Sequence, residues 1–218
     1  SEAIRKSSAN FNFSENNLDQ KLKVREKEHV FLLPASIRKV KDPMFLIPAF
    51  IRWGKEDPSV KLHIIGNPLD SKLLRRLQHT TKTAKNIKFL GLLSKKEVLE
   101  RMKKSIAVLN TSLSEGMCGA LLEAMAVGSC PVVVRGIPGN TALVGHNSTG
   151  YVFEDPESFV EIGKFLVKER RKNDDNDDDD DGNGKAALQR GREHEAKWSD
   201  RQTLKQTQTQ TQTQTQTQ

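Results

Sequence analysis

The chain has 218 residues, 35% of them hydrophobic, and a formal net charge of +7. No apolar run approaches the ~18 residues of a membrane span, no signal peptide is visible, and Cys118 and Cys130 give neither a disulfide framework nor metal-ligand spacing. These features argue against an integral membrane protein and a disulfide-stabilised secreted domain. They favour one cytoplasmic domain with polar ends, although the secretory pathway stays open because the chain begins with Ser1.

The first part of the chain predicts alternating strands and helices. Residues 1–27 are polar and without periodicity, and we interpret them as a linker or the end of a missing N-terminal domain. His29 to Leu33 predicts a strand, followed by a basic loop over residues 34–41. Asp42 and Pro43 predict the start of a helix that runs to about Trp53, with a kink at Pro48.

The next elements continue the alternation. Residues 60–65 predict a strand that ends at a turn containing Asn67, and residues 70–82 predict an amphipathic helix with a basic outer face. Residues 87–90 predict a short strand. Ser94 and Glu97 have the spacing of a capping box, which predicts a helix ending near Lys104.

A βαβ unit is predicted at the centre of the chain. An apolar strand over residues 106–109 leads into a polar loop over 110–115 and a glycine-bearing turn over 116–119. A helix from Gly119 to about Val127 follows, Gly128 ends it, and residues 131–134 predict a second buried strand. Ligands of parallel sheets bind beyond the carboxyl ends of the strands, where Glu115 and the turn lie.

The last part of the chain changes composition. Residues 147–153 predict a turn and a short strand, and Asp155 with Pro156 predicts a helix ending near Lys168. The whole pattern indicates an α/β domain, a Rossmann-like doubly wound parallel sheet, over residues 28–168. We interpret residues 169–185 as a disordered acidic insert, 186–205 as a possible C-terminal helix and 206–218 as a disordered Gln-Thr repeat.

The charges are unevenly distributed. Seven aspartates lie between Asp174 and Asp181, so the rest of the chain has 28 − 7 = 21 acids against 35 bases. A basic domain suits an anionic ligand such as a nucleotide diphosphate, and it would equally suit nucleic acid. Solvated surface lysine is the ordinary alternative for most of these residues.

Two carboxylates and a glycine turn form the candidate site. Glu115 lies in the polar loop, and Glu123 lies one turn into an otherwise apolar helix. The helix N-terminus can hold a phosphate, the glycines allow a close approach, and Glu123 can accept hydrogen bonds from ligand hydroxyls. A purely structural role for Glu123, favoured by the helix dipole, is the alternative.

The stretch SEGMCGALLEAMAVGSCPVV resembles the signature of retaining glycosyltransferases of family 4, the group 1 domain of the GT-B fold. The resemblance assigns Glu115 to the donor sugar, with a catalytic role, and Glu123 to the nucleotide ribose. It also implies that the amides of the turn contact the sugar and the diphosphate. The turn residues concerned are Gly116, Met117, Cys118, Gly119 and Ala120. Met117 replaces the usual Phe.

The basic loop matches the family only in part. Lys41 falls on the lysine that the family uses for the donor phosphates, but Ser36 stands where the family has an arginine, and Ala35 stands where it has a glycine. Arg38 lies two residues late and is the expected substitute. Asn67, in the turn after the next strand, completes the predicted donor-binding set.

The resemblance implies transfer of a sugar from a nucleotide-diphosphate sugar with retention, without a metal ion or other cofactor. It covers about residues 28–168, so an N-terminal acceptor domain is expected as a missing partner and the isolated fragment is expected to be inactive. A catalytically incomplete nucleotide-sugar-binding or regulatory relative is the first alternative. A basic nucleic-acid-binding domain is the second, although no aromatic residues interleave with the bases, so no nucleic-acid partner is expected.

Overall fold

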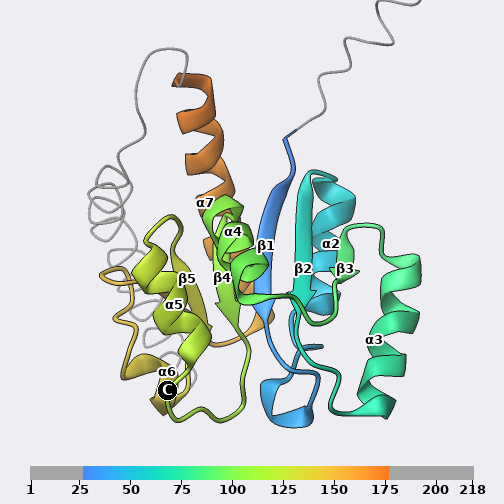
Figure 1. The fold of residues 1–218 in the computed structure, drawn as a ribbon. Coiled ribbons are helices and arrows are strands. Elements are labelled where there is room, and N and C mark those ends of the chain that lie inside the picture. Colours follow the sequence, from blue (N-terminus) through green and yellow to red (C-terminus); the bar gives the residue numbers. More distant parts are fainter. Residues whose placement is uncertain (1–26, 177–218) are drawn as a thin grey trace, which may run out of the picture.

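Six parallel strands form the sheet in the computed structural model, which describes residues 27–176 (Figure 1). Their order across the sheet is β3-β2-β1-β4-β5-β6. The strands are β1 (His29–Pro34), β2 (Val60–Ile65), β3 (Ile87–Phe89), β4 (Ala107–Asn110), β5 (Val132–Arg135) and β6 (Tyr151–Phe153). The parallel Rossmann-like sheet expected from the alternating pattern is confirmed.

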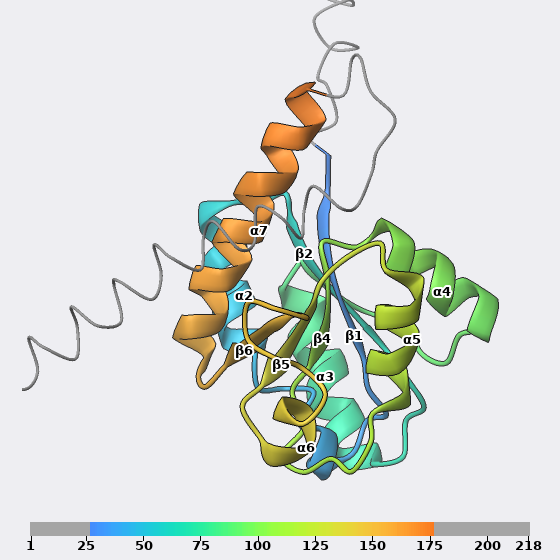
Figure 2. The ribbon, with the colours of Figure 1, turned by 90° about the vertical axis from the view of Figure 1, so that its left-hand side faces the viewer.

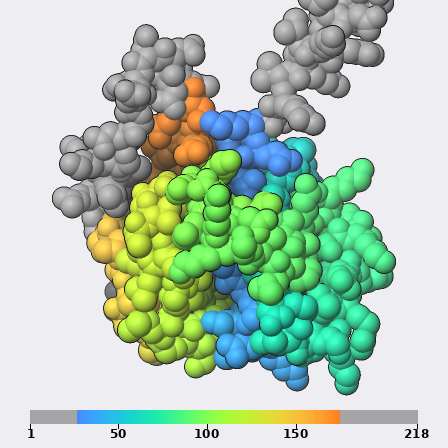
Figure 3. All heavy atoms as spheres, viewed as in Figure 1, coloured from blue at the N-terminus to red at the C-terminus, as the bar shows by residue number. Residues whose placement is uncertain are grey.

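Helices cover both faces of the sheet (Figure 2). They are η1 (Lys39–Lys41), α2 (Ile47–Glu56), α3 (Ser71–Thr83), α4 (Lys95–Lys104), α5 (Gly119–Val127), α6 (Pro138–Thr141) and α7 (Pro156–Asn176). Buried side chains of α2, α3 and α7 share one apolar cluster, and those of α4 and α5 share the other. The space-filling view shows α4 and α5 covering the near face (Figure 3).

The strand order reverses beside β1. The chain passes outward from β1 to β2 and β3, then returns through α4 to β4 on the other side of β1. The loops that leave the carboxyl ends of β1 and β4 therefore diverge to opposite faces of the sheet. Such a switch point is the place where parallel α/β sheets bind their ligands.

Local sequence signals set several helix ends. The Asp70 carboxylate accepts hydrogen bonds from the amides of Lys72 (2.9 Å) and Leu73 (3.0 Å), which caps α3. The capping box of α4 forms, with the Ser94 amide donating to Glu97 at 2.9 Å. Gly128 ends α5 in the left-handed region, at a φ of 67°.

The prediction for Asp42 and Pro48 is wrong. Lys39–Lys41 form a short 3-10 turn that ends at Asp42, and α2 begins only at Ile47. The Asp42 carboxylate pairs with Arg135 at 3.2 Å instead of capping a helix. Pro48 lies in the first turn of α2, where a missing N–H breaks no helical hydrogen bond, so the kink is not needed.

Helix α7 is longer than the sequence pattern indicates. It runs to Asn176 rather than ending near Lys168. Its added turns are held by Arg171, which donates to His29 Nε2 at 3.0 Å and to Asp57 at 2.8 Å. The sequence-based interpretations of residues 1–26 and of everything after residue 176 lie outside the described residues.

An aromatic cluster joins three elements on one face of the sheet. Phe31 of β1 is fully buried, and its ring centroid lies 5.6 Å from Phe50, 5.5 Å from Trp53 and 5.9 Å from Phe159. Phe50 and Trp53 belong to α2, and Phe159 belongs to α7. Edge and tilted contacts at these separations add to the burial of apolar area. The position of β1, and so of the loop after it, depends on this packing.

We expect Phe31→Ala to lower the free energy of unfolding by about 3–5 kcal/mol, because it leaves a cavity between α2, α7 and the sheet. Leu92→Ala is the control, since Leu92 is 71% exposed and its truncation should change stability by less than about 0.5 kcal/mol. Urea unfolding of the three proteins measures both values. Equal decreases in the free energy of unfolding in the two variants would show that Phe31 is not a centre of packing.

Candidate functional site

The loops after β1 and β4 are tied together at the switch point. The Leu113 amide donates to the Val40 carbonyl at 2.8 Å, and the Thr111 hydroxyl donates to the Lys41 carbonyl at 2.9 Å. Thr111 is buried, so this contact is shielded from water. The two bonds hold Lys41 against the loop that carries Glu115.

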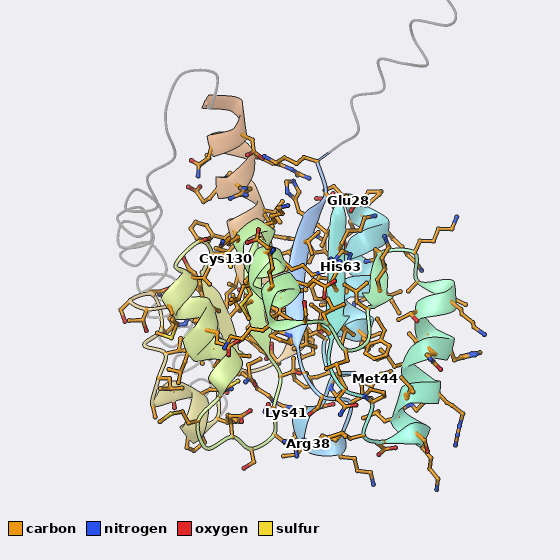
Figure 4. All side chains as sticks on the ribbon, in the orientation of Figure 1. Glu28, Arg38, Lys41, Met44, His63 and Cys130 are labelled. Atoms are coloured by element: carbon orange, nitrogen blue, oxygen red, sulfur yellow. The ribbon has the colours of Figure 1, made fainter. Side chains whose placement is uncertain are left out.

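Lys41 and Glu115 form an ion pair between these two loops. The labelled Lys41 lies at the carboxyl end of the sheet (Figure 4). The two side chains are only 17% and 11% exposed. Glu115 also accepts from the Ser112 hydroxyl at 2.9 Å and from the Asn110 amide group at 3.5 Å. The same carboxylate oxygen, Oε2, receives all three donors, so its position is fixed.

These donors keep Glu115 ionised. Burial on its own would raise the pKa of Glu115, but the hydrogen bonds from Lys41 and Ser112 outweigh it, and the pKa lies below its ordinary value of 4.5. Glu115 is therefore a carboxylate at neutral pH. It can accept hydrogen bonds from a ligand or stabilise a nearby positive charge.

Asn110 and Asn140 form a buried amide layer beneath the carboxylate. Asn110 Oδ1 accepts from the Ser112 amide at 2.8 Å and from Asn140 Nδ2 at 3.4 Å. Asn140 is fully buried and also donates to the Arg135 carbonyl at 3.0 Å. These bonds connect the loop after β4 with the loop after β5.

Gly139 allows that second loop to approach closely. A Cβ added at position 139 would lie 1.8 Å from the Glu115 carbonyl oxygen. No side chain fits at that separation without moving the backbone. The glycine therefore lets α6 close directly over the residue that carries the carboxylate.

Arg135, the last residue of β5, contacts two side chains of the segment after Lys41. Its guanidinium pairs with Asp42 at 3.2 Å and lies 3.8 Å from the centre of the Phe45 ring. A guanidinium over an aromatic face is attracted by the ring quadrupole. The end of β5 is thereby fixed to the segment that follows Lys41.

The N-terminus of α5 is open. Its N-cap residue, Cys118, makes no side-chain capping bond, and the first turn carries no acidic residue. The Leu121 and Leu122 amides both donate to the Cys118 carbonyl, at 3.0 and 3.2 Å. The two helical residues before them are Gly119 and Ala120. Met117, before the cap, is 71% exposed. A helix start without a side-chain cap favours an anion.

Glu123 lies one turn into the same helix. Its Oε1 accepts from Lys95 Nζ at 2.8 Å, and its side chain is 36% exposed. Lys95 is the first residue of α4, so the capping box at Ser94 helps to set its position. The sequence gives no signal for this pair, because the partners are 28 residues apart and on different helices.

The remaining predicted donor-binding residues lie in the loops after β1 and β2. The Ser36 carbonyl accepts from the Arg38 amide, and the Asn67 carbonyl accepts from the Ile37 amide, both at 2.9 Å. Arg38 is exposed, and its guanidinium makes no hydrogen bond or ion pair within residues 27–176. The structure thus joins Lys41 directly to Glu115, whereas within residues 27–176 the side chains of Ser36, Arg38 and Asn67 make no hydrogen bond or ion pair with that pair. A donor-binding role for these three residues stays a prediction.

Sequence reasoning did not find the residues that support Glu115. Ser112 has a weak signal, since it lies three residues before Glu115 in a polar loop. Asn140 lies in the loop after β5, which a parallel sheet places at the same edge. The ion pair between Asp42 and Arg135 has no local signal, because 93 residues separate its partners.

Comparison with known proteins identifies the sequence pattern. The sequence profile described as Glycosyl transferases group 1 matches residues 14–177. The glycosyltransferase 1 domain-containing protein 1 of Xenopus tropicalis is 35% identical over 141 residues, which cover 65% of this chain and 41% of that protein. The alpha-monoglucosyldiacylglycerol synthase of Acholeplasma laidlawii is 32% identical over 144 residues, covering 66% and 36%. The chain spans less than half the length of either relative.

Solved structures share the fold. Anabaena HepE in complex with UDP and glucose matches with a TM-score of 0.59 and 24% identity, over 72% of this chain and 43% of that one. A Rickettsia africae glycosyltransferase matches with a TM-score of 0.59 and 17% identity over the same shares. The pneumococcal O-GlcNAc transferase GtfA gives 0.54 and 21%, over 67% and 30%. The likeness confirms the expected GT-B type of Rossmann-like domain.

The described part of the chain contains neither a membrane-spanning helix nor a cluster of metal-binding side chains. Between residues 27 and 176, no helix is long and apolar enough to cross a bilayer. Over the same residues, no group of three or more His, Cys, Asp or Glu side chains could hold a metal ion.

The pKa of Glu115 predicts a pH-dependent stability. Because folding lowers this pKa, the ionised group stabilises the native state above the unfolded value, near 4.5, and this contribution is lost as the pH falls through the lower native pKa. The difference in unfolding free energy between wild type and Glu115→Gln should therefore shift against the wild type as the pH falls from about 6 to about 3.

Urea unfolding of both proteins over this range measures the shift. Lys41→Met supplies the control background, because without the lysine the remaining burial opposes ionisation and the shift should shrink or reverse. A difference that does not change with pH in the wild-type background would contradict the assignment of the ion pair.

Proposed function

Since this chain belongs to the glycosyl transferases group 1 family, we propose that it holds the donor site of a glycosyltransferase and binds a nucleotide-diphosphate sugar at the β1/β4 switch point. The observation that carries the proposal is the Lys41–Glu115 ion pair beside the open N-terminus of α5. These features place a cation, an anion and an uncapped helix start at the same end of the sheet. A diphosphate joined to a hydroxyl-rich sugar needs such a combination of groups.

The diphosphate is assigned to Lys41 and the start of α5. The start of α5 has no side-chain cap and offers the positive end of the helix dipole. Lys41 has three donor positions, so it can contact a phosphate oxygen while it keeps its bond to Glu115. Gly116 and Gly119 leave space for the ligand, since an added Cβ at either position would meet nothing within 4 Å.

The sugar is assigned to Glu115. In glycosyl transfer, positive charge develops at the anomeric carbon as the bond to the diphosphate breaks. A carboxylate fixed by Lys41, Ser112 and Asn110 is ionised before the ligand arrives and needs little reorganisation during the reaction. Retention of configuration belongs to the proposal through the family resemblance.

The ribose is assigned to Glu123. One carboxylate oxygen, Oε1, pairs with Lys95, and within residues 27–176 the other makes no hydrogen bond. A carboxylate held through one oxygen can still accept hydrogen bonds from ribose hydroxyls through the other. Anabaena HepE was solved with UDP-glucose and the pneumococcal GtfA with UDP and GlcNAc, which supports a uridine diphosphate sugar as the first donor to test.

The acceptor is assigned to a second domain, as the family resemblance implies. The chain covers 41% of the Xenopus relative and 36% of the Acholeplasma one, so the activity of the whole protein is part of the proposal. Transfer requires donor and acceptor to be held together. We therefore expect this chain alone to bind donor without transferring sugar at a useful rate.

A catalytically incomplete relative is the second candidate. Ser36 stands in the loop where the family has an arginine, and Arg38 is exposed and unpaired within the described residues. In this candidate the domain still binds a nucleotide sugar, and turnover is lost even in the full-length protein. Donor binding by this chain, together with turnover by the full-length protein, separates the two candidates.

We expect Lys41→Ala to weaken UDP binding about tenfold or more, and uridine binding much less. The variant loses a charge-assisted contact worth about 1.5–3 kcal/mol that only the phosphates receive. Lys39→Ala is the matched control, because Lys39 is an exposed lysine in the same turn. Calorimetric titration with both ligands measures the effect. Equal weakening of UDP and uridine would place Lys41 away from the phosphates.

Substitution of the two glutamates should affect the binding of different ligands. Glu123→Gln should weaken binding of UDP and UDP-glucose alike, because both carry the ribose. Glu115→Gln should spare UDP and weaken UDP-glucose, each loss being about 1.5–3 kcal/mol for a charged acceptor. Titration of both variants with both ligands decides the roles, with Glu161→Gln on α7 as a control. Unchanged affinity in both variants would remove the donor-site assignment.

A further inference from the structure

A basic surface lies along one edge of the sheet, and of its residues only Lys95, which pairs with Glu123, contacts the proposed donor site within residues 27–176. Residues 71–96 contain eight Lys or Arg and no Asp or Glu. All eight are exposed, and they are Lys72, Arg75, Arg76, Lys82, Lys85, Lys88, Lys95 and Lys96. Within residues 27–176, only Lys95 among them makes an ion pair. We call these eight residues the basic edge.

Three elements carry the basic edge. α3 buries Leu77 and packs Leu73 and Leu74 against the core, so its charged side chains must face outward. Figure 4 shows the side chains of α3 extending away from the sheet, several of them ending in nitrogen. β3 is the outermost strand and α4 begins soon after it. In Figure 3 this part of the chain forms the outer right-hand wall of the molecule.

Two exposed leucines lie at one end of this surface. Leu69, just before α3, is 58% exposed, and Leu92, just after β3, is 71% exposed. Their loops follow neighbouring strands and are joined by a hydrogen bond from the Gly66 amide to the Gly91 carbonyl at 2.9 Å. Lys72 and Lys95 lie in the first turns of the helices that start beside these loops.

We propose that the basic edge, with Leu69 and Leu92, is a docking surface for an anionic lipid bilayer. Lysine and arginine side chains without an acidic partner are attracted to acidic lipid headgroups. Each such side chain adds a favourable binding energy when it lies close to the membrane surface. Exposed leucines beside those bases can enter the boundary between headgroups and acyl chains, as the apolar side of an interfacial helix does. This contact brings the carboxyl end of the sheet, and so the ion pair of Lys41 and Glu115, toward the membrane surface.

The apolar residues favour a bilayer over a nucleic acid. The phosphate backbone of a nucleic acid would attract the same lysine and arginine side chains, but it offers no apolar partner for the two exposed leucines. Single-stranded nucleic acid is usually held by aromatic stacking, and residues 71–96 contain one aromatic, Phe89, which packs against the core. A bilayer matches both the charge and the apolar residues.

The test is co-sedimentation of the full chain with phosphatidylcholine vesicles that contain or lack phosphatidylserine. We expect binding only to the anionic vesicles, and it should weaken as NaCl rises from about 0.1 to about 0.5 M. Arg75→Glu/Arg76→Glu should weaken binding about tenfold or more, since it reverses two charges. Leu69→Ser/Leu92→Ser should weaken binding at the lower salt concentration as well, because it removes the apolar anchors.

Lys103→Glu/Lys104→Glu is the matched control. It makes the same change in net charge at the last turn of α4, away from the leucines, so its effect should be clearly smaller. Unchanged UDP affinity in each variant would show that the fold and the donor site are intact, which separates this proposal from the proposed function.

Two outcomes would overturn the proposal. The first is no preference for anionic vesicles at low salt, or equal losses in the Arg75/Arg76 and Lys103/Lys104 variants. The second is tight binding to duplex RNA in a gel-shift assay that depends on Arg75 and Arg76, with vesicle binding that does not depend on the leucines. That result would assign the basic edge to a nucleic acid.

Discussion

The ion pair between Lys41 and Glu115 is the interaction on which the site depends. It joins the loops after β1 and β4, which diverge to opposite faces of the sheet because the strand order reverses between these strands. The surrounding contacts all serve the same position: Thr111 holds the Lys41 backbone, and Ser112 and Asn110 hold the Glu115 carboxylate. Without its partners, a carboxylate that is 11% exposed would have its pKa raised by burial.

Much of the fold follows from local sequence. Helix ends were predictable where a residue acts on its own backbone neighbours, as Asp70, Ser94 and Gly128 do. The failures occur where a distant partner competes. Asp42 has the sequence context of a helix cap, but its carboxylate pairs with Arg135 of β5. Helix α7 continues past Lys168, where Arg171 donates hydrogen bonds to His29 and Asp57. No local pattern contains these partners.

In the candidate site, too, some residues were predictable from local sequence and others were not. The motif that contains Glu115 and Glu123 is continuous in sequence, so both carboxylates and the open start of α5 could be predicted from it. Their lysines could not be derived from spacing, because Lys41 precedes Glu115 by 74 residues and Lys95 precedes Glu123 by 28. Lys41 was found only through the family resemblance. Lys95 was missed, since only the packing of α4 on α5 brings it to Glu123.

The close approach of Gly139 to Glu115 makes the site sensitive to a residue that donates nothing to it. With the Glu115 carbonyl oxygen 1.8 Å from where a Cβ would be, even alanine at position 139 would act as a wedge between two loops. The displaced residue would be the one whose carboxylate is held by Lys41. In a set of homologous chains, variation at this position would therefore report on the geometry of the candidate site, although Gly139 has no side chain with which to contact a ligand.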